Sequence, residues 1–67
     1  MVAWKYHVYV RRMDYDDSIN WEYVTTFYKA KAARKYMKDN SNFWYRMDTE
    51  YTNNEITSIE YAKGELK

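Results

Sequence analysis

The chain has 67 residues, no cysteine and one histidine, which excludes disulfides and metal sites built from cysteine or histidine clusters. Eleven Lys and Arg against ten Asp and Glu give a formal net charge of +1, which by itself predicts no polyanionic partner. Aromatic residues make up 21% of the chain, proline is absent and glycine occurs once, so disorder is excluded and we expect one folded domain over residues 1–67.

The size of the chain limits its core. A domain this short buries only about 60% of the surface that its unfolded form exposes, and small domains without disulfides or metals commonly depend on association. We therefore expect a homo-oligomer, in the simplest case a dimer. No segment approaches the ~20 apolar residues of a membrane span, and no charged segment leads into an apolar one at the start. We expect a cytoplasmic protein with no membrane partner and no cofactor.

Residues 2–13 have the period of a β-strand. Apolar and aromatic residues fall on one side: Val2, Trp4, Tyr6, Val8 and Val10. Polar residues and one tyrosine fall on the other side: Lys5, His7, Tyr9 and Arg11. This alternation predicts a strand with one buried face. His7 lies on the wetter side, and because no Asp, Ser or Cys stands in a catalytic spacing we expect an ordinary solvated histidine.

A polar loop and a second strand follow. The stretch "DYDDSIN", residues 14–20, is rich in turn formers and carries three acids: Asp14, Asp16 and Asp17. Residues 20–26 then alternate, with three residues on one side: Trp21, Tyr23 and Thr25. The acids suggest a calcium loop, but an EF-hand counted from Asp14 needs Gly and Glu where Ile19 and Thr25 stand. We expect a solvated hairpin loop and no metal.

The period becomes helical between Tyr28 and Asn40. At about 100° per residue, one face carries small and apolar side chains: Ala30, Ala32, Ala33, Tyr36 and Met37. The opposite face carries cations: Lys31, Arg34, Lys35 and Lys38. Such segregation predicts an amphipathic helix that docks on a sheet through its alanine side. The turn formers "DNSN" at residues 39–42 end it.

Two strands joined by a turn complete the chain. Residues 43–51 alternate, "TNN" supplies a turn, and residues 56–63 form the last strand. A two-residue turn would pair Met47 with Glu60 and bring a charge to the apolar face. A three-residue turn with Asn54 in the left-handed conformation gives other pairs: Tyr45 with Tyr61, Met47 with Ile59, and Thr49 with Thr57. We favour this second register because it keeps one face apolar.

The predicted order is strand–strand–helix–strand–strand (ββαββ). This is an α+β domain in which a four-stranded antiparallel sheet carries one helix on one face. We expect the helix to cover the face of Trp4, Tyr6 and Val8. The sequence contains no Gly-rich phosphate loop, Ser–His–Asp set or metal-ligand cluster, and no cleft is predicted beside Asp48 and Glu50. We therefore expect no enzyme activity.

The sheet face away from the helix is the first candidate partner-binding surface. Trp44 is out of phase with the apolar residues around it, and six residues would share this face: Lys5, His7, Tyr9, Arg11, Trp44 and Arg46. The candidate partner-binding residues among them are Tyr9, Arg11, Trp44 and Arg46. Trp beside Arg and Tyr is typical of a protein-interface hot spot, where another protein or a second copy of the chain could bind. Partial burial of Trp44 against its neighbours and base stacking by a nucleic acid are the alternatives.

The basic side of the helix is the second candidate surface. Its four cations, Lys31, Arg34, Lys35 and Lys38, could each neutralise a phosphate, and no acid lies among them. The solvated face of any docked helix shows the same pattern, and the pI of about 7.9 is below that of dedicated nucleic-acid binders. We expect a solvated face, with nucleic-acid binding as the alternative.

The run "WEYVTTFYKAKAARKYM", preceded by "WKYHVYV" and followed by "FWYRMDTEY", resembles the layout of many small phage and mobile-element accessory proteins. The resemblance covers most of the chain and implies an accessory protein, such as an anti-defence inhibitor of the anti-CRISPR kind. It carries over no functional residues. We expect a non-enzymatic module that binds and modulates a host or defence macromolecule. A nucleic-acid-binding accessory protein and a small-ligand sponge, whose aromatic rings stack on a base between protomers, are the alternatives.

Overall fold

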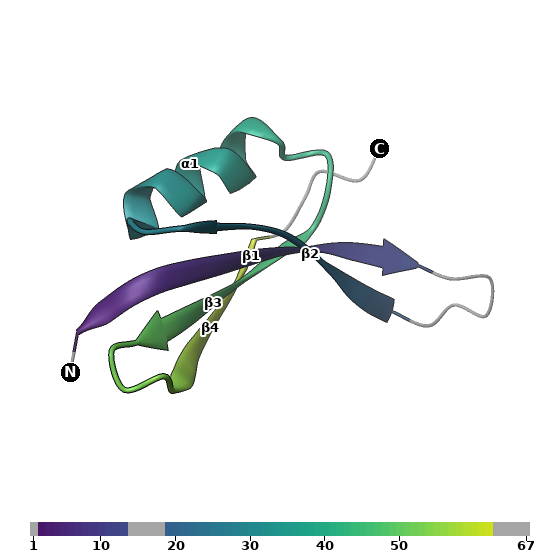
Figure 1. Cartoon of the computed structure of the whole chain (residues 1–67). Helices are drawn as coiled ribbons and strands as arrows, with labels where there is room; N and C mark the ends of the chain where they lie inside the picture. The colour runs from purple at the N-terminus through teal and green to yellow at the C-terminus, as the bar shows by residue number, and fades with distance from the viewer. Residues whose placement is uncertain (1, 14–18, 63–67) are drawn as a thin grey trace.

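The computed structural model describes residues 2–13 and 19–62 (Figure 1). The elements follow in the order β1 (Ala3–Met13), β2 (Ile19–Phe27), α1 (Ala30–Asp39), β3 (Tyr45–Tyr51) and β4 (Ile56–Ala62). The strands form one sheet in the order β2-β1-β3-β4, and each neighbouring pair is antiparallel. The predicted α+β fold is therefore confirmed, with element boundaries within two residues of those expected.

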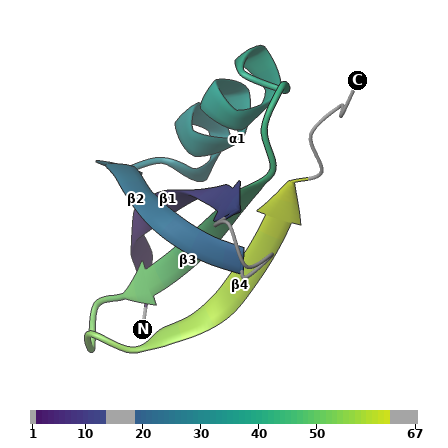
Figure 2. The same cartoon turned by 90° about the vertical axis from the view of Figure 1, so that its right-hand side faces the viewer.

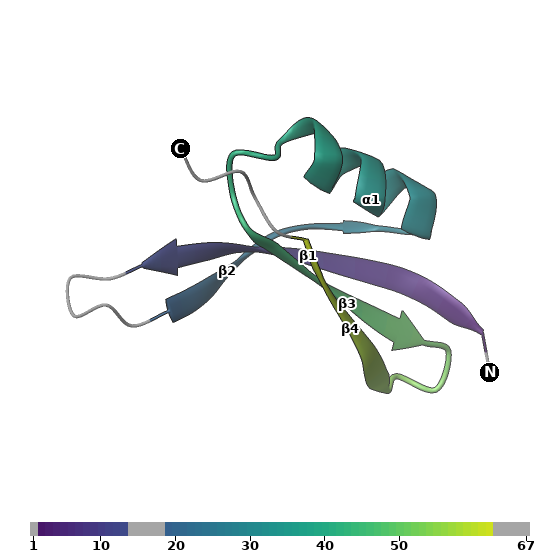
Figure 3. The same ribbon diagram turned by 180° about the vertical axis from the view of Figure 1, so that it is seen from behind.

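The helix and the sheet form two layers. Helix α1 lies over one face of the sheet in Figures 1 and 3, and it packs mainly on β1 and β2. The pairing of β3 with β1 ends at Val10, and one further hydrogen bond joins the Arg11 N–H to the Trp44 carbonyl. Arg12 and Met13 pair with β2 alone. These ends of β1 and β2 project beyond the helix as a two-stranded arm (Figure 1).

The core lies between α1 and the middle of the sheet. Its buried residues are Val8, Val10, Ala33, Met37, Tyr45 and Met47. The Tyr36 ring joins the layers, because its centroid lies 5.6 Å from that of Phe27 and 5.9 Å from that of Tyr45. Ala33 is fully buried and brings the helix backbone close to the sheet. The alanine side of the helix faces the sheet as expected, except that Ala32 is exposed.

The pairing register shifts three times within the described strands. The shift between β1 and β3 falls at Trp4, that between β1 and β2 at Val24, and that between β3 and β4 at Thr57. At each place one strand has an extra residue, which is a β-bulge. Because side chains alternate with period two, a bulge turns the residues beyond it to the opposite face.

The bulge at Val24 corrects the expected face of β2. Thr25 pairs with Val8 on the helix side, whereas Tyr23 pairs with Tyr9 on the other side. Val24 itself packs against the core. Strict alternation predicts Trp21, Tyr23 and Thr25 on one face. In the structure, Trp21 and Tyr23 lie on the face opposite to that of Thr25.

The bulge at Trp4 corrects a second expectation. Trp4 is exposed and not part of the core under the helix. Its indole Nε1–H donates to the carbonyl of Tyr51 at 3.1 Å, and the Lys5 ammonium lies 4.3 Å from its ring centroid. The extra residue leaves Ala3 paired with Tyr51, so Trp4 does not continue the row of Tyr6 and Val8.

The β3–β4 hairpin begins in the favoured register and then leaves it. Asn54 is left-handed, with φ 67°, and the Tyr51 N–H donates to the Glu55 carbonyl at 2.9 Å, as a three-residue turn requires. Beyond the bulge, however, Met47 pairs with Glu60 and Arg46 with Tyr61. The predicted pairs are wrong for this reason: Tyr45–Tyr61, Met47–Ile59 and Thr49–Thr57. Glu60 is tolerated on the helix side because β4 is an edge strand, where the carboxylate reaches a helix cation.

Candidate functional site

The sheet face opposite α1 is called the open face below. The residues on it come from all four strands: Lys5, His7, Tyr9, Arg11, Trp21, Tyr23, Thr26, Arg46, Asp48, Glu50, Ile56, Ile59 and Tyr61. Large side chains remain exposed there, with exposed fractions of 56% for Tyr23, 53% for Ile59 and 61% for Tyr61. This face therefore combines exposed aromatic rings with arginine.

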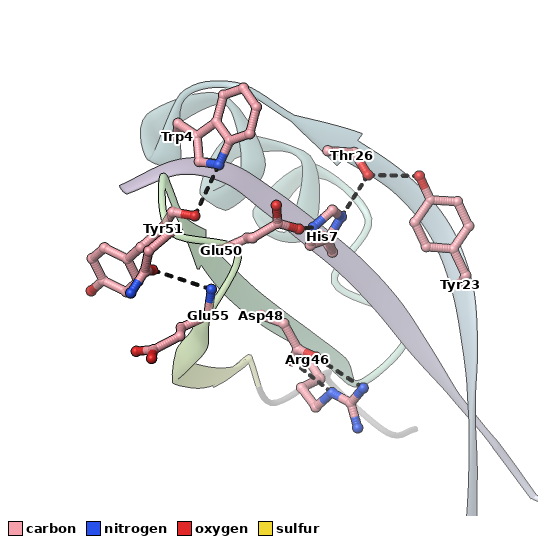
Figure 4. Close-up of polar contacts among 10 residues, drawn as sticks. Trp4, His7, Tyr23, Thr26, Arg46, Asp48, Glu50, Tyr51 and Glu55 are labelled. Atoms are coloured by element: carbon pink, nitrogen blue, oxygen red, sulfur yellow. Dashed lines mark hydrogen bonds and ion pairs between the residues drawn. The ribbon is translucent and has the colours of Figure 1, made fainter. Parts of the chain in front are cut away.

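Arg46 lies at the centre of the open face. Its guanidinium carbon is 4.4 Å from the ring centroid of Tyr9 and 5.4 Å from that of Trp21, within cation–π distance of both. Its Nη2 donates to Asp48 Oδ2 at 3.1 Å, and its Nε lies 2.8 Å from Asp48 Oδ1 as an ion-pair contact (Figure 4). The side chains are only 22% and 9% exposed. Arg46 is therefore held in place on this surface, and Asp48 balances its charge.

The two edge strands approach each other across the open face. Trp21 of β2 and Tyr61 of β4 have ring centroids 5.7 Å apart, although β1 and β3 separate their strands in the sheet. The sheet twists strongly enough that β2 crosses in front of β3 and β4 in Figure 2. The two rings therefore meet over the open face, and Trp21 also lies beside Arg46.

The base of the arm holds a second arginine–tryptophan contact. The Arg11 guanidinium carbon lies 5.1 Å from the ring centroid of Trp44, and the Arg11 N–H donates to the Trp44 carbonyl at 2.8 Å. Trp44 precedes β3 and is half-buried. The four residues predicted for this surface therefore lie on one face, as two arginine–aromatic contacts: Tyr9 with Arg46 and Trp44 with Arg11.

His7 is not the freely solvated side chain that we expected. Its Nδ1 is 2.8 Å from Thr26 Oγ1 and its Nε2 is 2.9 Å from Glu50 Oε1, and Tyr23 Oη lies 2.7 Å from the same Thr26 oxygen (Figure 4). The imidazole is 18% exposed and links β2, β1 and β3. Because the carboxylate can only accept, Nε2 carries a proton in this arrangement. This network of hydrogen bonds joins three strands. It lies at the end of the open face that is farther from the arm.

The basic helix face is less available to anions than the sequence suggests. Arg34 donates from Nε and Nη2 to the Glu60 carboxylate at 3.0 and 3.1 Å, and Lys35 Nζ donates to Asp39 Oδ2 at 2.8 Å. The hydrogen bond from each cation to its carboxylate raises the pKa of Arg34 and of Lys35 above the usual values. Lys31 and Lys38 are exposed on the same face. Intramolecular acids thus neutralise two of the four predicted cations.

The described part of the chain was also compared with the requirements of a metal site and of a membrane-spanning helix. No group of three His, Cys, Asp or Glu residues there is placed to hold a metal ion. None of the described helices is both long and apolar enough to cross a membrane. The acids considered for a calcium loop, Asp14, Asp16 and Asp17, lie outside the described residues.

Among the members of the open face that sequence reasoning missed are Trp21, Tyr23, Asp48, Ile59 and Tyr61. Trp21 and Tyr61 are turned outward by the bulges at Val24 and Thr57, which strict alternation does not anticipate. Asp48 was considered only as a possible acid with Glu50. Its i, i+2 spacing from Arg46 places the two on the same side of a strand, a signal that could have identified the ion pair.

Comparison with protein families finds no matching family model, and comparisons with curated proteins and with solved structures give no significant match. The open face itself is therefore the main indication of function.

Proposed function

We propose that this chain is a non-enzymatic protein-binding module that uses the open face as its contact surface. The composition of that face supports the proposal, because Trp, Tyr and Arg are the residues that dominate binding energy at protein interfaces. Arg46 and Tyr9 lie in the middle, and exposed Tyr23, Ile59 and Tyr61 surround them. A partner that covers these exposed aromatic side chains and the ordered arginine beside them would exclude water from the contact.

One observation carries the proposal: the β-bulges turn aromatic residues toward solvent. Without the shifts at Val24 and Thr57, alternation would bring Trp21, Tyr23 and Tyr61 to the helix side. A small domain with a thin core loses apolar burial by this arrangement. A contiguous exposed aromatic surface of this kind in a soluble protein is typical of an interaction site.

The charges favour a protein over a nucleic acid as the partner. Phosphate binding needs cations whose charge is available, and Arg46, Arg34 and Lys35 are each paired with a carboxylate within the chain. Lys31 and Lys38 remain exposed on the helix face, on the other side of the molecule from the exposed rings. On β1, Lys5 and Arg11 each lie against a tryptophan ring. The resemblance to phage and mobile-element accessory proteins makes a host or defence protein the first class of partner to test.

Affinity capture with matched variants tests the proposal. The immobilised protein is incubated with nuclease-treated bacterial lysate and compared with Tyr23→Ser/Tyr61→Ser on the open face and Lys31→Gln/Lys38→Gln on the helix face. Circular dichroism first establishes that both variants fold. We expect a protein retained by the wild type and by the helix-face variant, and lost by the open-face variant.

The opposite pattern would overturn the proposal. Retention by the open-face variant with loss by the helix-face variant, or loss of all bound protein on nuclease treatment, would favour the nucleic-acid alternative on the basic helix face. Hydrogen exchange of the purified complex then maps the contact, with protection expected on β2 and β4 around Tyr23 and Tyr61.

A further inference from the structure

A cavity on the helix side of the sheet lies outside the proposed interface. Helix α1 packs mainly on β1 and β2, and beside its first turns it leaves a space over β3 and β4. The space there has a volume of about 410 Å³, within the range of small-molecule sites. Its lining comes from β1, α1, β3 and β4, and it is open to solvent on one side.

The cavity lining combines apolar side chains with side chains that carry a hydroxyl group. Met47, 2% exposed, forms part of the floor, and Ala3 and Ala30 leave room because neither extends beyond a methyl group. The rings of Tyr6 and Tyr51 stand on the β1 and β3 sides. Aromatic faces of this kind are the surfaces on which planar heterocycles stack.

Hydroxyl groups lie on the β3 and β4 sides of the cavity. Thr49 of β3 lines it, and the residue is 7% exposed. Because a hydroxyl can both donate and accept, the Thr49 side chain can hydrogen-bond a polar atom of a ligand. On β3 and β4 the Tyr51 and Ser58 hydroxyls lie 3.1 Å apart, and each can donate or accept. These hydroxyl groups can therefore complement either a donor or an acceptor.

The charges in the lining cancel. Arg34 and Glu60 are its only ionised side chains, and they bridge α1 to β4 through a bidentate pair. A free anion would have to displace Glu60, and a free cation would have to displace Arg34. The pair uses only part of the guanidinium N–H groups, and each carboxylate oxygen keeps an acceptor lone pair. A donor and an acceptor thus lie side by side without net charge.

We propose that this cavity binds an uncharged planar heterocycle that bears a cyclic amide, such as the base of a uridine-type nucleoside. The ring stacks on a tyrosine, the amide N–H donates to Glu60, and the adjacent carbonyl accepts from Arg34. Thr49 hydrogen-bonds an exocyclic or sugar oxygen. Of its lining residues only Ile59 also belongs to the open face, so the two proposals can fail separately.

Amide chemical-shift titration of the folded protein with uridine tests the site. Cytidine lacks the amide N–H and serves as the edge control, and uridine 5′-monophosphate serves as the charge control. Ala30→Leu fills the cavity, and Ala32→Leu makes the same change on the exposed side of the helix. We expect saturable shifts at Ala3, Ala30 and Thr49 with uridine, weaker ones with cytidine, and no gain in affinity from the phosphate.

The variants decide whether those shifts report this cavity. Ala30→Leu should abolish the saturable response to uridine, and Ala32→Leu should leave it unchanged. The proposal is overturned if uridine gives no saturable shift up to millimolar concentration, or if the shifts survive in Ala30→Leu. Equal binding of cytidine overturns the amide-edge assignment, and tighter binding of the monophosphate overturns the requirement for an uncharged ligand.

Discussion

Arg46 shows how single residues build the open face. Its guanidinium makes cation–π contacts with the rings of Tyr9 and Trp21, and it forms an ion pair with Asp48 of the same strand. A planar, delocalised cation suits this position because it can stack and form a bidentate pair together. Sequence alternation was sufficient to bring Arg46 and Tyr9 to one face, but it did not identify Asp48 as the counter-ion.

Breaking this pair should be costly. Asp48→Ala leaves a mostly buried guanidinium without its carboxylate, and we expect a loss of about 3 kcal/mol in the free energy of unfolding. Urea unfolding followed by circular dichroism measures it. Arg46→Met/Asp48→Leu removes both charges and should cost less than Asp48→Ala alone, because no unpaired charge remains. If the double variant is the less stable of the two, the pair does not have the role assigned here.

At the scale of the element, α1 is positioned by small residues. Ala33 is fully buried between the helix and the sheet, whereas Ala32, one position earlier, is exposed. Helical periodicity in the sequence places both on the apolar side. Only the axial orientation of the docked helix distinguishes them, and it depends on contacts with residues distant in the sequence such as Phe27 and Tyr45.

Enlarging the two alanines should therefore have different effects. Ala33→Leu overpacks the helix–sheet contact and should lower the free energy of unfolding by about 1–3 kcal/mol. Ala32→Leu places the same side chain in solvent on a helix and should change it by less than about 0.5 kcal/mol. Thermal and urea unfolding compare the two variants. Equal effects would mean that α1 docks in a different orientation.

At the scale of the whole molecule, the core is thin and one face is left uncovered. Six residues are buried in the core cluster, while Tyr23, Ile59 and Tyr61 are more than half exposed on the open face. The homo-oligomer predicted from chain length remains a prediction. The open face is the surface through which two copies would gain most apolar burial.

Self-association can be measured without a partner. We expect light scattering to show a mass that rises from 8.3 kDa toward twice that value as concentration increases. Ile59→Lys places a charge in the open face and should keep the protein monomeric, whereas Lys31→Glu on the helix face should not. A monomer at high micromolar concentration would contradict the prediction. A dimer formed through this face should also dissociate when a protein partner binds there.

Periodicity in the chain was enough to identify the five elements, their order, the amphipathic helix and the left-handed turn residue Asn54. These features follow from local preferences that each segment expresses alone: period two for strands, period 3.6 for helices, and the tolerance of asparagine for positive φ. The faces of Trp4, Trp21 and Tyr61, and the ion pair between Arg34 and Glu60, were decided only when the strands paired and the helix docked. A single extra residue in one strand reverses every face beyond it, and the choice between the two registers depends on packing between segments far apart in the sequence.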